Sequence, residues 1–375
     1  MKICLDARYK VKSGSSSYVL NLVPAMVRQE SGHEFILLKY ATQQFEFEGR
    51  MAKVVNTPEN DLLHMLWTCF VLPIKLRLWK ADVFHSMKMP GPFWMGARTV
   101  NTMHSIFKPY KGSFPVSLKT RLYTFLFANA MIRRSHRLIA VSNFVSDCLT
   151  EVYEVEPERI DTIYHGVGNE FGPCDKQEVS EYLAAKSLPQ QYVLCVGNVF
   201  AVKNHLTAVR AFAESGVSAE THLVIAGKTN DSYAENVVNE IEKLGLQGRV
   251  HLLGFVAGHD LSMLLNGAYC LLFPSLTEGF GVTLLEAFQC GLPVIASKRG
   301  SLWELGQGVA LFVDDPMDAS GFASKIDELF GNPILRDELS IAVQAEAGKY
   351  SWQASAKSHL ECYEKACGTL PQSPG

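Results

Sequence analysis

The chain contains 375 residues with a mass of 41.6 kDa, a length that suggests two domains of about 150 residues or a little more. Apolar residues make up 47% and charged residues 19%, which is the composition of a folded globular protein and excludes a disordered or fibrous one. The formal net charge is only −3, so the chain lacks the overall basic character that would predict a nucleic-acid partner.

In the first half of the chain, short β-branched runs alternate with helical patterns. The predicted strands are Ile3–Leu5, Phe35–Lys39, Lys53–Val55, Val83–His85, Thr99–Met103 and Leu138–Val141. The predicted helices fall near 16–29, 60–79, 116–134 and 143–153. Continuous apolar strands joined by amphipathic helices are typical of a buried parallel sheet with right-handed crossovers.

The second half repeats this alternation. Its predicted strands are Tyr192–Val196, His222–Ala226, Val250–Leu253, Cys270–Phe273, Val294–Ala296 and Ala310–Val313. Its predicted helices fall near 204–215, 233–244, 259–266, 282–290 and 319–330, and a last helix runs from Trp352 to Cys367. The fold class predicted from both halves is α/β, with two doubly wound domains.

The first domain is expected to span residues 1–170 and the second residues 171–350, with the join near Gly166–Pro189, where Gly, Pro and polar residues gather. Residues 351–375 contain the last helix, which we expect to pack back toward the first domain, and a tail. Ligands of doubly wound sheets bind outside the carboxyl ends of the strands. The loops that follow the strands, around a cleft between the two domains, are therefore the expected site.

The chain carries no signature of export. Its nine cysteines include no C-x-x-C pair, and three of them (Cys4, Cys195 and Cys270) lie in apolar runs, which predicts buried thiols in a reducing compartment. The N-terminal sequence MKICLDAR is charged at positions 2, 6 and 8 and lacks the apolar core of a signal peptide. The longest apolar stretch, Leu62–Ile74, is too short to span a bilayer. We expect a cytoplasmic protein without a transmembrane segment.

Charge is distributed unevenly along the chain. Residues 1–170 hold 21 Lys and Arg against 15 Asp and Glu, a net +6, whereas residues 171–375 hold 14 against 23, a net −9. Within residues 62–146 there are 12 basic residues and one acid, Asp82. This asymmetry predicts a polyanionic partner for the first half alone.

The most informative segment, Phe273–Ala287, reads FPSLTEGFGVTLLEA. A strand ends, a loop carries Glu278, and a helix begins near Gly281, so Glu286 lies in its second turn. Glycines let the backbone approach a ligand, and free amides at a helix start bind anions. A sugar joined to a pyrophosphate fits, with Glu278 on sugar hydroxyls and Glu286 on a ribose; the alternative is a pair of solvated acids. The predicted donor-binding residues here are Gly279, Phe280, Gly281, Val282, Thr283 and Glu286.

Three further loops follow predicted strands. Gly197 closes the first strand of the second half, and Lys203 stands at the next helix start, where its charge either stabilises a diphosphate leaving group or faces solvent. The Asp6–Arg8 turn and the small-residue loop around Gly14 follow the first strand, and either line the cleft or serve only as turns. Gly14, Gly197 and Lys203 are expected to bind the donor. His104 ends a strand of the first half, where a histidine is either structural or catalytic.

Other chemistries lack their signatures. No G-x-G-x-x-G motif is present, which argues against a nicotinamide dinucleotide. The string Gly227-Lys228-Thr229 resembles the end of a phosphate-binding Walker motif, but His222 stands where its first glycine belongs. Neither G-x-S-x-G nor H-E-x-x-H nor a metal-ligand cluster appears. We therefore expect activity that needs neither a metal nor a cofactor.

Taken together, these segments resemble the retaining glycosyltransferases of family four, whose GT-B architecture has two facing Rossmann-like domains. The resemblance covers essentially the whole chain. The opening resembles the family's D-A-R…G-I-G-R-Y, and the two glutamates eight positions apart match its signature. The further matching segments are Ala140–Ser142, Ile163–Val167, Gly291–Ser297 and Ser351-Trp352, which are similar to V-S, N-G-V, G-x-P-V-I-A-S and F-S-W.

The chain also departs from the family pattern. Asn198 and Val202 occupy places where the family often has an Arg before the diphosphate-binding Lys. Ser16 and Ser17 replace the second Gly and the Arg of the opening motif, and Ser105 follows His104 where an acidic residue is common. These departures bear on the identity of the donor and on the rate rather than on the reaction class.

The resemblance implies a glycosyltransferase that retains the anomeric configuration and uses a GDP- or UDP-linked sugar, held mainly by the second domain. The acceptor would be a glycan or lipid-linked glycan on the first domain, in cell-surface polysaccharide or lipopolysaccharide biosynthesis, with a mannosyl or related donor favoured. The catalytic residues would be His104, Lys203 and Glu278. The alternatives are a nucleotide-sugar epimerase of the same fold and a non-catalytic nucleotide-sugar-binding subunit.

Two segments of the basic window combine aromatic and basic side chains. They are residues 62–79 and 119–137, which are either core helices with solvated charges or docking segments for an anionic membrane. Their occurrence together favours peripheral binding at the inner face of the cell membrane. The predicted acceptor and membrane residues are Lys75, Arg77, Lys119, Arg121, Arg133, Arg134 and Arg137.

Overall fold

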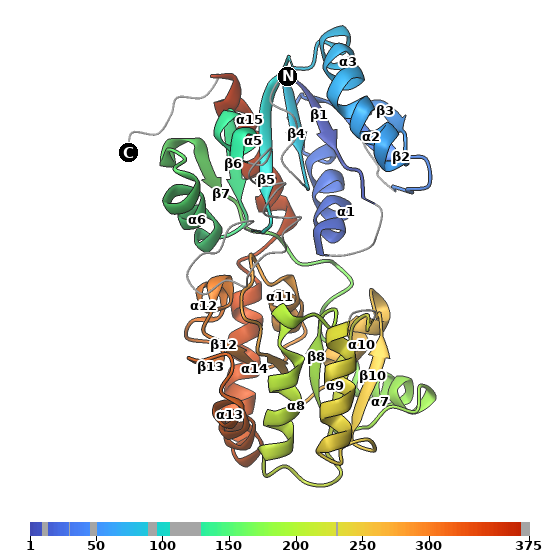
Figure 1. Cartoon of the computed structure of the whole chain (residues 1–375), viewed down its shortest axis with the longest axis vertical. Coiled ribbons are helices and arrows are strands. Elements are labelled where there is room, and N and C mark those ends of the chain that lie inside the picture. Colours follow the sequence, from blue (N-terminus) through green and yellow to red (C-terminus); the bar gives the residue numbers. More distant parts are fainter. Residues whose placement is uncertain are drawn as a thin grey trace. The chain divides into compact units, whose positions relative to one another are not determined.

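The structure, a computed structural model, describes residues 1–9, 14–29, 31–45, 51–88, 96–105, 129–229 and 232–368. These residues form two compact units (Figure 1). The first unit contains the described residues up to Gly166 and those from Tyr350 onward, and the second contains the described residues of Val167–Lys349. Lys119 and Arg121, and most of the helix expected at 116–134, lie outside the described residues.

The first unit is built on a seven-stranded sheet in the order β3-β2-β1-β4-β5-β6-β7, in which every neighbouring pair is parallel. Its strands are β1 (Lys2–Asp6), β2 (Glu34–Tyr40), β3 (Met51–Thr57), β4 (Val83–Ser86), β5 (Arg98–Met103), β6 (Arg137–Ala140) and β7 (Ile160–Thr162). Its helices are α1 (Gly14–Val27), α2 (Asp61–Leu66), a π-helical turn (Trp67–Val71), α3 (Leu72–Trp79), α5 (Asn129–Arg134), α6 (Asn143–Tyr153) and α15 (Trp352–Cys367).

The second unit is built on a six-stranded parallel sheet in the order β10-β9-β8-β11-β12-β13. Its strands are β8 (Tyr192–Val196), β9 (His222–Ala226), β10 (Val250–Gly254), β11 (Cys270–Phe273), β12 (Val294–Ser297) and β13 (Leu311–Val313). Its helices are α7 (Lys176–Ala185), α8 (His205–Glu214), α9 (Ser232–Lys243), α10 (His259–Gly267), α11 (Val282–Gln289), α12 (Gly300–Gly306), α13 (Ala319–Gly331) and α14 (Pro333–Ala347).

The sheet of the first unit is buried on both faces. Successive side chains of a strand point to opposite sides of the sheet, and those of β1 enter two different core clusters. Ile3 and Leu5 of β1 belong to a core cluster with residues of α1 and α15. Cys4, between them, belongs to a second cluster that includes Leu72 and Leu76 of α3. Figure 1 shows α15, the last helix of the chain, lying among the elements of this unit. The C-terminal helix therefore completes the core of the N-terminal sheet.

The predicted strands agree with the structure, and four elements were not predicted. They are β7, α7, α12 and α14, and α7 lies inside the segment expected to be the join. The helix from Asp61 to Trp79 also differs from expectation. It continues through Lys75 and Arg77 and so reaches 19 residues, which by length and composition alone is enough to cross a membrane. Only 17% of its 18-residue apolar window is buried inside the protein. The helix is longer than the apolar run Leu62–Ile74 within it, and the expectation that this segment does not span a bilayer stays a prediction.

Candidate active site

The loops predicted to bind the donor meet at one point of the second sheet. Its order, β10-β9-β8-β11-β12-β13, reverses direction between β8 and β11. Loops that follow the two strands at such a reversal diverge to opposite faces and leave a crevice, where doubly wound sheets bind ligands. The loop after β8 carries Gly197 and Lys203, and the loop after β11 carries Glu278. The topology therefore places these three residues at one edge of one unit.

The first turn of the loop after β8 leaves no room for a side chain at its glycine, Gly197. Gly197 has a φ of 140°, a conformation that L side chains rarely adopt. A Cβ at this residue would lie 3.3 Å from the side-chain carbons of Lys203. A Cβ on Gly227, after β9, would overlap the carbonyl oxygen of Gly197 itself. The side chain of Asn198, at the place where an Arg was considered, accepts a 3.2 Å hydrogen bond from the amide of Lys228. The glycines thus let the backbones of two neighbouring loops touch.

Lys203 and Glu278 form an ion pair across the crevice. The Nζ of Lys203 donates a 2.6 Å hydrogen bond to Oε1 of Glu278, and it lies 5.2 Å from the ring centre of Phe273. The two side chains are 24% and 13% exposed, so a ligand can reach them but bulk water screens them little. The backbone also joins the loops, since the amide of Leu276 donates to the carbonyl of Val202 at 2.9 Å.

Asn204 fixes the turn that presents Lys203. Its backbone is left-handed, with a φ of 57°, a conformation in which Asn is favoured over most residues. Its buried side-chain amide donates to the carbonyls of Pro274, at 3.1 Å, and Pro316, at 2.6 Å. The role of Asn204 could not be predicted from the sequence, because its partners lie 70 and 112 positions away along the chain.

The helix α11 begins directly beside Glu278. Gly281 precedes it with a φ of 81°, and no side chain caps the helix start. The first amides of an uncapped helix are free to bind an anion, and the helix dipole adds to the attraction. Ser301 of α12, an element that was not predicted, donates through Oγ to the carbonyl of Glu278 at 3.1 Å. The loop that carries Glu278 is therefore held from two sides.

Glu286 occupies the second turn of α11 and is buried. Burial, together with the nearby charge of Glu170, raises the pKa of Glu286 to about 8, although a hydrogen bond with Thr283 works in the opposite direction. With a pKa of about 8, this carboxyl is mostly protonated at neutral pH. A ligand that donates hydrogen bonds to it would favour the ionised form.

The remaining predicted catalytic residue, His104, belongs to the first unit. It follows β5 at the carboxyl edge of that sheet, and its Nε2 lies 2.8 Å from the carbonyl oxygen of Met87. A carbonyl can only accept, so Nε2 carries the proton and Nδ1 is left as a hydrogen-bond acceptor. Burial lowers the pKa of His104 to about 4, with a further lowering by Lys88, while the bond to Met87 raises it. His104 is therefore a neutral acceptor rather than an acid at neutral pH.

Behind His104 lies a buried network of histidines and tyrosines. The ring of Tyr18 packs edge-on against His104 at 4.7 Å, and its hydroxyl contacts His359 of α15 at 2.6 Å. The same hydroxyl lies 2.9 Å from Thr102, which in turn lies 2.8 Å from His85. These groups come from α1, β4, β5 and α15. None of this network was predicted, because its members lie up to 341 residues apart.

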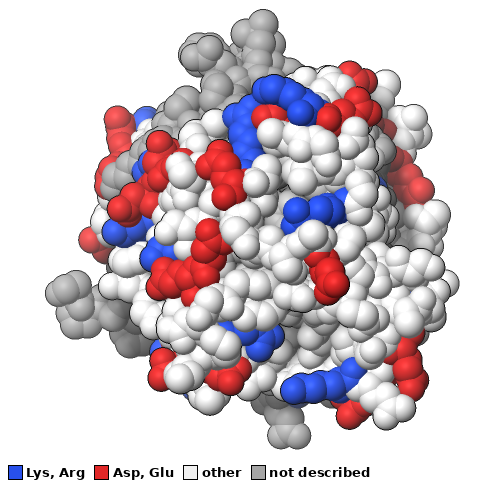
Figure 2. Space-filling model, turned by 90° about the horizontal axis from the view of Figure 1, so that it is seen from below, with Lys and Arg blue, Asp and Glu red and all other residues white. Residues whose placement is uncertain are grey.

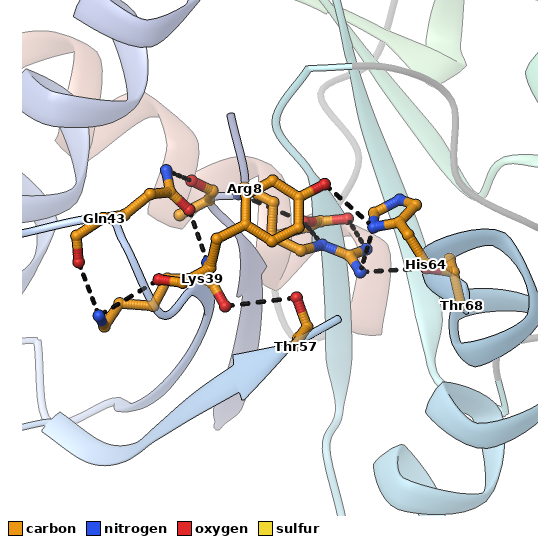
Figure 3. Close-up of polar contacts among 9 residues, drawn as sticks. Arg8, Lys39, Gln43, Thr57, His64 and Thr68 are labelled. Carbon is orange, nitrogen blue, oxygen red and sulfur yellow. Dashed lines mark hydrogen bonds and ion pairs between the residues drawn. The ribbon is translucent and has the colours of Figure 1, made fainter. Parts of the chain in front are cut away.

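The Asp6–Arg8 turn is structural. The guanidinium of Arg8, whose side chain is only 3% exposed, binds both oxygens of Asp6 at 2.6 Å (Figure 3). Its remaining nitrogen contacts Thr68 at 3.0 Å and His64 at 3.3 Å. Arg8 therefore fastens α2 and the π-helical turn to the end of β1. Gly14, which was predicted to bind donor, is the first residue of α1.

The predicted membrane residues fall into three groups. Lys75, Arg77 and Arg134 are exposed. Arg133 is exposed but pairs with Glu154 at 2.5 Å. The prediction was wrong for Arg137, which is buried in β6 and pairs with Asp161 at 2.5 Å, so its side chain cannot contact a membrane surface. Strand position explains the difference, since β6 lies between β5 and β7 in the sheet and all four of its residues are buried.

Charge on one face of the molecule and the metal-binding potential of the described residues also bear on the choice of a site. On the face seen in Figure 2, acidic and basic side chains are interspersed and form no continuous patch of one sign. In the described part of the chain, no group of three or more His, Cys, Asp or Glu side chains could hold a metal ion. All nine cysteines are free thiols. Metal-independent activity stays a prediction.

Two family models match the chain, one on each unit. Residues 12–171 match Glycosyltransferase Family 4, and residues 182–345 match Glycosyl transferases group 1. The serotype-specific mannosyltransferase WbdA of Escherichia coli is 26% identical over 242 residues, which are 63% of this chain and 29% of WbdA. The O-antigen chain mannosyltransferase RfbU of Salmonella typhimurium is 27% identical over 231 residues, which are 61% of this chain and 60% of RfbU. The aligned part of this chain thus spans less than two thirds of either relative.

The fold also matches a solved structure along its length. Anabaena HepE, crystallised in complex with UDP and glucose, has a TM-score of 0.78 and 18% identity over 97% of this chain and 100% of its own. The two doubly wound sheets and this match show that the chain has the GT-B fold. With the two family models, the chain is a bacterial-type glycosyltransferase of family 4.

Proposed function

We propose that the protein transfers a hexose from a nucleotide-diphospho-sugar to a glycan or lipid-linked glycan, with retention of the anomeric configuration and without a metal. The observation that carries the proposal is the cluster at the β8/β11 crevice. A cation, a carboxylate, an uncapped helix start and a second carboxyl in the next turn lie together on one unit. A nucleoside diphosphate joined to a sugar has complementary groups for each of these.

In this proposal the diphosphate lies on the amides that begin α11, beside Lys203. Glu286 accepts hydrogen bonds from the ribose hydroxyls, and Glu278 accepts from the transferred sugar. Lys203 and the helix start stabilise the charge that develops on the diphosphate as its bond to the anomeric carbon breaks. Because these charges are already held in place by the loops, little reorganisation is needed during the reaction. In the absence of the Arg that the family often carries, the amides that begin α11 would share this role with Lys203.

The acceptor oxygen forms its bond to the anomeric carbon on the face from which the diphosphate departs, and its proton passes to a diphosphate oxygen. No protein nucleophile is needed for this route. His104, as a neutral acceptor at Nδ1, would orient a hydroxyl of the sugar or of the acceptor. It would not act as a general acid, because its pKa of about 4 leaves it without a second proton at neutral pH.

The names of the relatives favour a mannosyl donor and a cell-surface polysaccharide, whereas HepE was crystallised with UDP and glucose. GDP-mannose and UDP-glucose are therefore the first donors to test, with a cytoplasmic site of action expected. The decisive experiment incubates the protein with a panel of nucleotide sugars and measures nucleoside diphosphate release with and without glycan or lipid-linked acceptors. Release that needs an acceptor supports transfer. Release of free nucleotide and sugar without any acceptor would indicate an epimerase or hydrolase, and binding without release would indicate a non-catalytic subunit.

A further inference from the structure

One helical segment of the first unit exposes an unusual row of large apolar side chains. Between Asp61 and Trp79, α2, the π-helical turn and α3 follow one another without a break. Every fourth residue on its outer side is large and apolar, with exposed fractions from 42% to 70%. This outer row consists of Leu62, Leu66, Phe70, Ile74 and Leu78, and Leu63, Met65 and Val71 extend it sideways.

The opposite side of the same segment is anchored. The inner row, His64, Thr68, Leu72 and Leu76, is offset from the outer row by two residues, which in an α-helix is a rotation of about 200°. Arg8 contacts His64 and Thr68 (Figure 3). Leu72 and Leu76 are fully buried. The anchoring fixes the rotation of the helix about its axis, so the outer row is held away from the body of the unit.

The π-helical turn keeps the outer row straight. In a regular α-helix, residues four apart drift by about 40° per step, so a row of five would wind around the axis. Trp67–Val71 instead has a wider turn, in which the amide of Leu72 bonds to the carbonyl of Trp67, five residues back. A wider turn rotates less per residue and offsets part of this drift. The segment thus presents one continuous apolar face.

Basic side chains border the second half of this face, whereas the one acid of the segment, Asp61, stands at its first residue. Lys75, Arg77 and Lys80 are exposed along the second half of the segment, and Lys53 of β3 lies 5.0 Å from the ring of Trp79. From Leu62 to Ala81 the sequence contains no Asp or Glu. The face therefore combines an apolar strip with a positive rim.

We propose that Asp61–Trp79 is an interfacial helix that docks the first unit on a bilayer containing anionic lipid. The outer row would enter the acyl boundary, while the basic rim would bind acidic headgroups. The helix lies along the surface rather than across the membrane, because a spanning helix could not keep its inner row bonded to Arg8 and buried in the unit. This inference deepens the proposed function, in which a lipid-linked acceptor would be met at that surface.

The composition of the face favours lipid over a protein partner or a second copy of the chain. The outer row offers no hydrogen-bonding side chain, whereas protein interfaces carry about one hydrogen bond per 100–200 Å². Lysine is depleted at protein interfaces, but it is the residue expected beside acidic headgroups. An apolar strip with a lysine-rich rim matches an interfacial helix on both counts.

The test uses the full chain and vesicles of phosphatidylcholine, with or without phosphatidylglycerol, at low and high salt. Co-flotation should require phosphatidylglycerol and weaken with salt. Phe70→Ser, Ile74→Ser and Leu78→Ser combined should lower the bound-to-free ratio at least about tenfold. Lys75→Glu with Arg77→Glu should do the same. The matched control is Ile334→Ser with Ile341→Ser on α14 of the second unit, where the two side chains are 72% and 71% exposed. This control should bind as the parent does.

Several outcomes would overturn the proposal. They are absence of binding, equal binding to neutral vesicles, or equal loss in the α14 control. A dimer in light scattering that the outer-row variant dissolves, without any vesicle binding, would assign the face to a second copy instead. Titration of every variant with UDP and GDP separates this result from the proposed function. A variant that loses vesicle binding but keeps nucleotide binding would show that only the helix is affected. Absence of nucleotide binding in the parent protein would instead count against the proposed function of the crevice.

Discussion

The Nζ of Lys203 lies 2.6 Å from Oε1 of Glu278, across the point where the strand order of the second sheet reverses. Both residues were predicted to bind the same ligand, one at its diphosphate and the other at its sugar. The structure shows that they also bind each other. Each side chain thus holds the other in place, at the cost of part of the charge that Lys203 can offer to phosphate.

This pairing makes the two residues interdependent. We expect Lys203→Ala to lower kcat by about 10² or more, since it removes a charge used most strongly in the transition state. Glu278→Gln should also lower kcat, and the double variant should be less impaired than the sum of the two free-energy changes, because each single change already breaks the pair. Nucleoside diphosphate release measures all three. Lys243→Ala, on an exposed side chain of α9, is the control.

Two results would contradict this account. If Lys203→Ala turns over within a few-fold of the parent, the lysine has no role at the leaving group. If the two losses add fully, the ion pair between Lys203 and Glu278 has no bearing on catalysis, and each residue acts on the donor alone.

Glu286 predicts a pH dependence of nucleotide binding. Its pKa of about 8 is above that of an ordinary glutamate, so the folded protein holds a proton there that must leave if ribose hydroxyls are to donate to a carboxylate. Affinity for the free nucleoside diphosphate should therefore rise by up to tenfold per pH unit as the pH approaches about 8, and then level off. Calorimetry in buffers of different ionisation enthalpy measures both the affinity and the proton released.

Glu286→Gln provides the comparison for this experiment. The amide cannot ionise, so its affinity should be lower than that of the parent at high pH and should lose the rise with pH. If the variant keeps the same rise, another group releases the proton. Glu278→Gln should retain the pH dependence, because its contact in the proposal is with the transferred sugar.

Much of the fold and of the donor-side cluster could be predicted from local sequence. The strands are short continuous apolar runs, and the turns after β8 and β11 carry glycines where side chains would collide. The elements that were missed lack such patterns. The helix α7 has only two buried residues, Val179 and Leu183, and α14 exposes Ile334 and Ile341, so its apolar period points away from its packed side. The strand β7 is short and carries Asp161, whose partners Arg137 and Lys365 lie on other elements.

Pairings between distant residues could not be predicted. Nothing in the local sequence of Tyr18 indicates that its hydroxyl meets His359 on the last helix. Arg8 carried a family resemblance and was considered for the cleft, yet its guanidinium is occupied by Asp6, Thr68 and His64. Such partners follow from how the elements pack, and a single sequence does not contain that information in its local patterns.

Close contact between two loops of the second unit predicts that a substitution at Gly227 strongly destabilises the folded protein. A Cβ there would overlap the carbonyl oxygen of Gly197, which cannot move without shifting the loop that presents Lys203. We expect Gly227→Ala to lower the free energy of unfolding by about 3 kcal/mol. Gly248→Ala is the matched control, since a Cβ at that residue would meet nothing within 4 Å, and it should change stability by less than about 0.5 kcal/mol. Urea unfolding of both variants decides; a mild effect at Gly227 would mean that the two loops are not in contact.

The buried histidines of the first unit predict acid lability of that unit. Burial lowers the pKa of His359 to about 4 and that of His85 well below its usual value, so both are neutral in the folded protein at neutral pH. The hydrogen bonds fit this state. Nδ1 of His359 donates to the carbonyl of Ser355 at 2.7 Å, so the neutral ring accepts the proton of Tyr18 at Nε2, and a second proton on His359 would force the Tyr18 hydroxyl to accept instead.

The sign of the effect follows from where protons bind. Below pH 6.5 the unfolded chain takes up protons that the folded unit refuses until about pH 4, so stability falls as the pH falls through this range. His359 alone would contribute up to about 3 kcal/mol of loss across that window. Urea unfolding followed by tryptophan fluorescence from pH 7 to pH 4 measures it, and His359→Gln, which has no proton to gain, should show a shallower slope. An equal slope in the variant would place the acid sensitivity elsewhere, because the Tyr18 network would then not resist protonation.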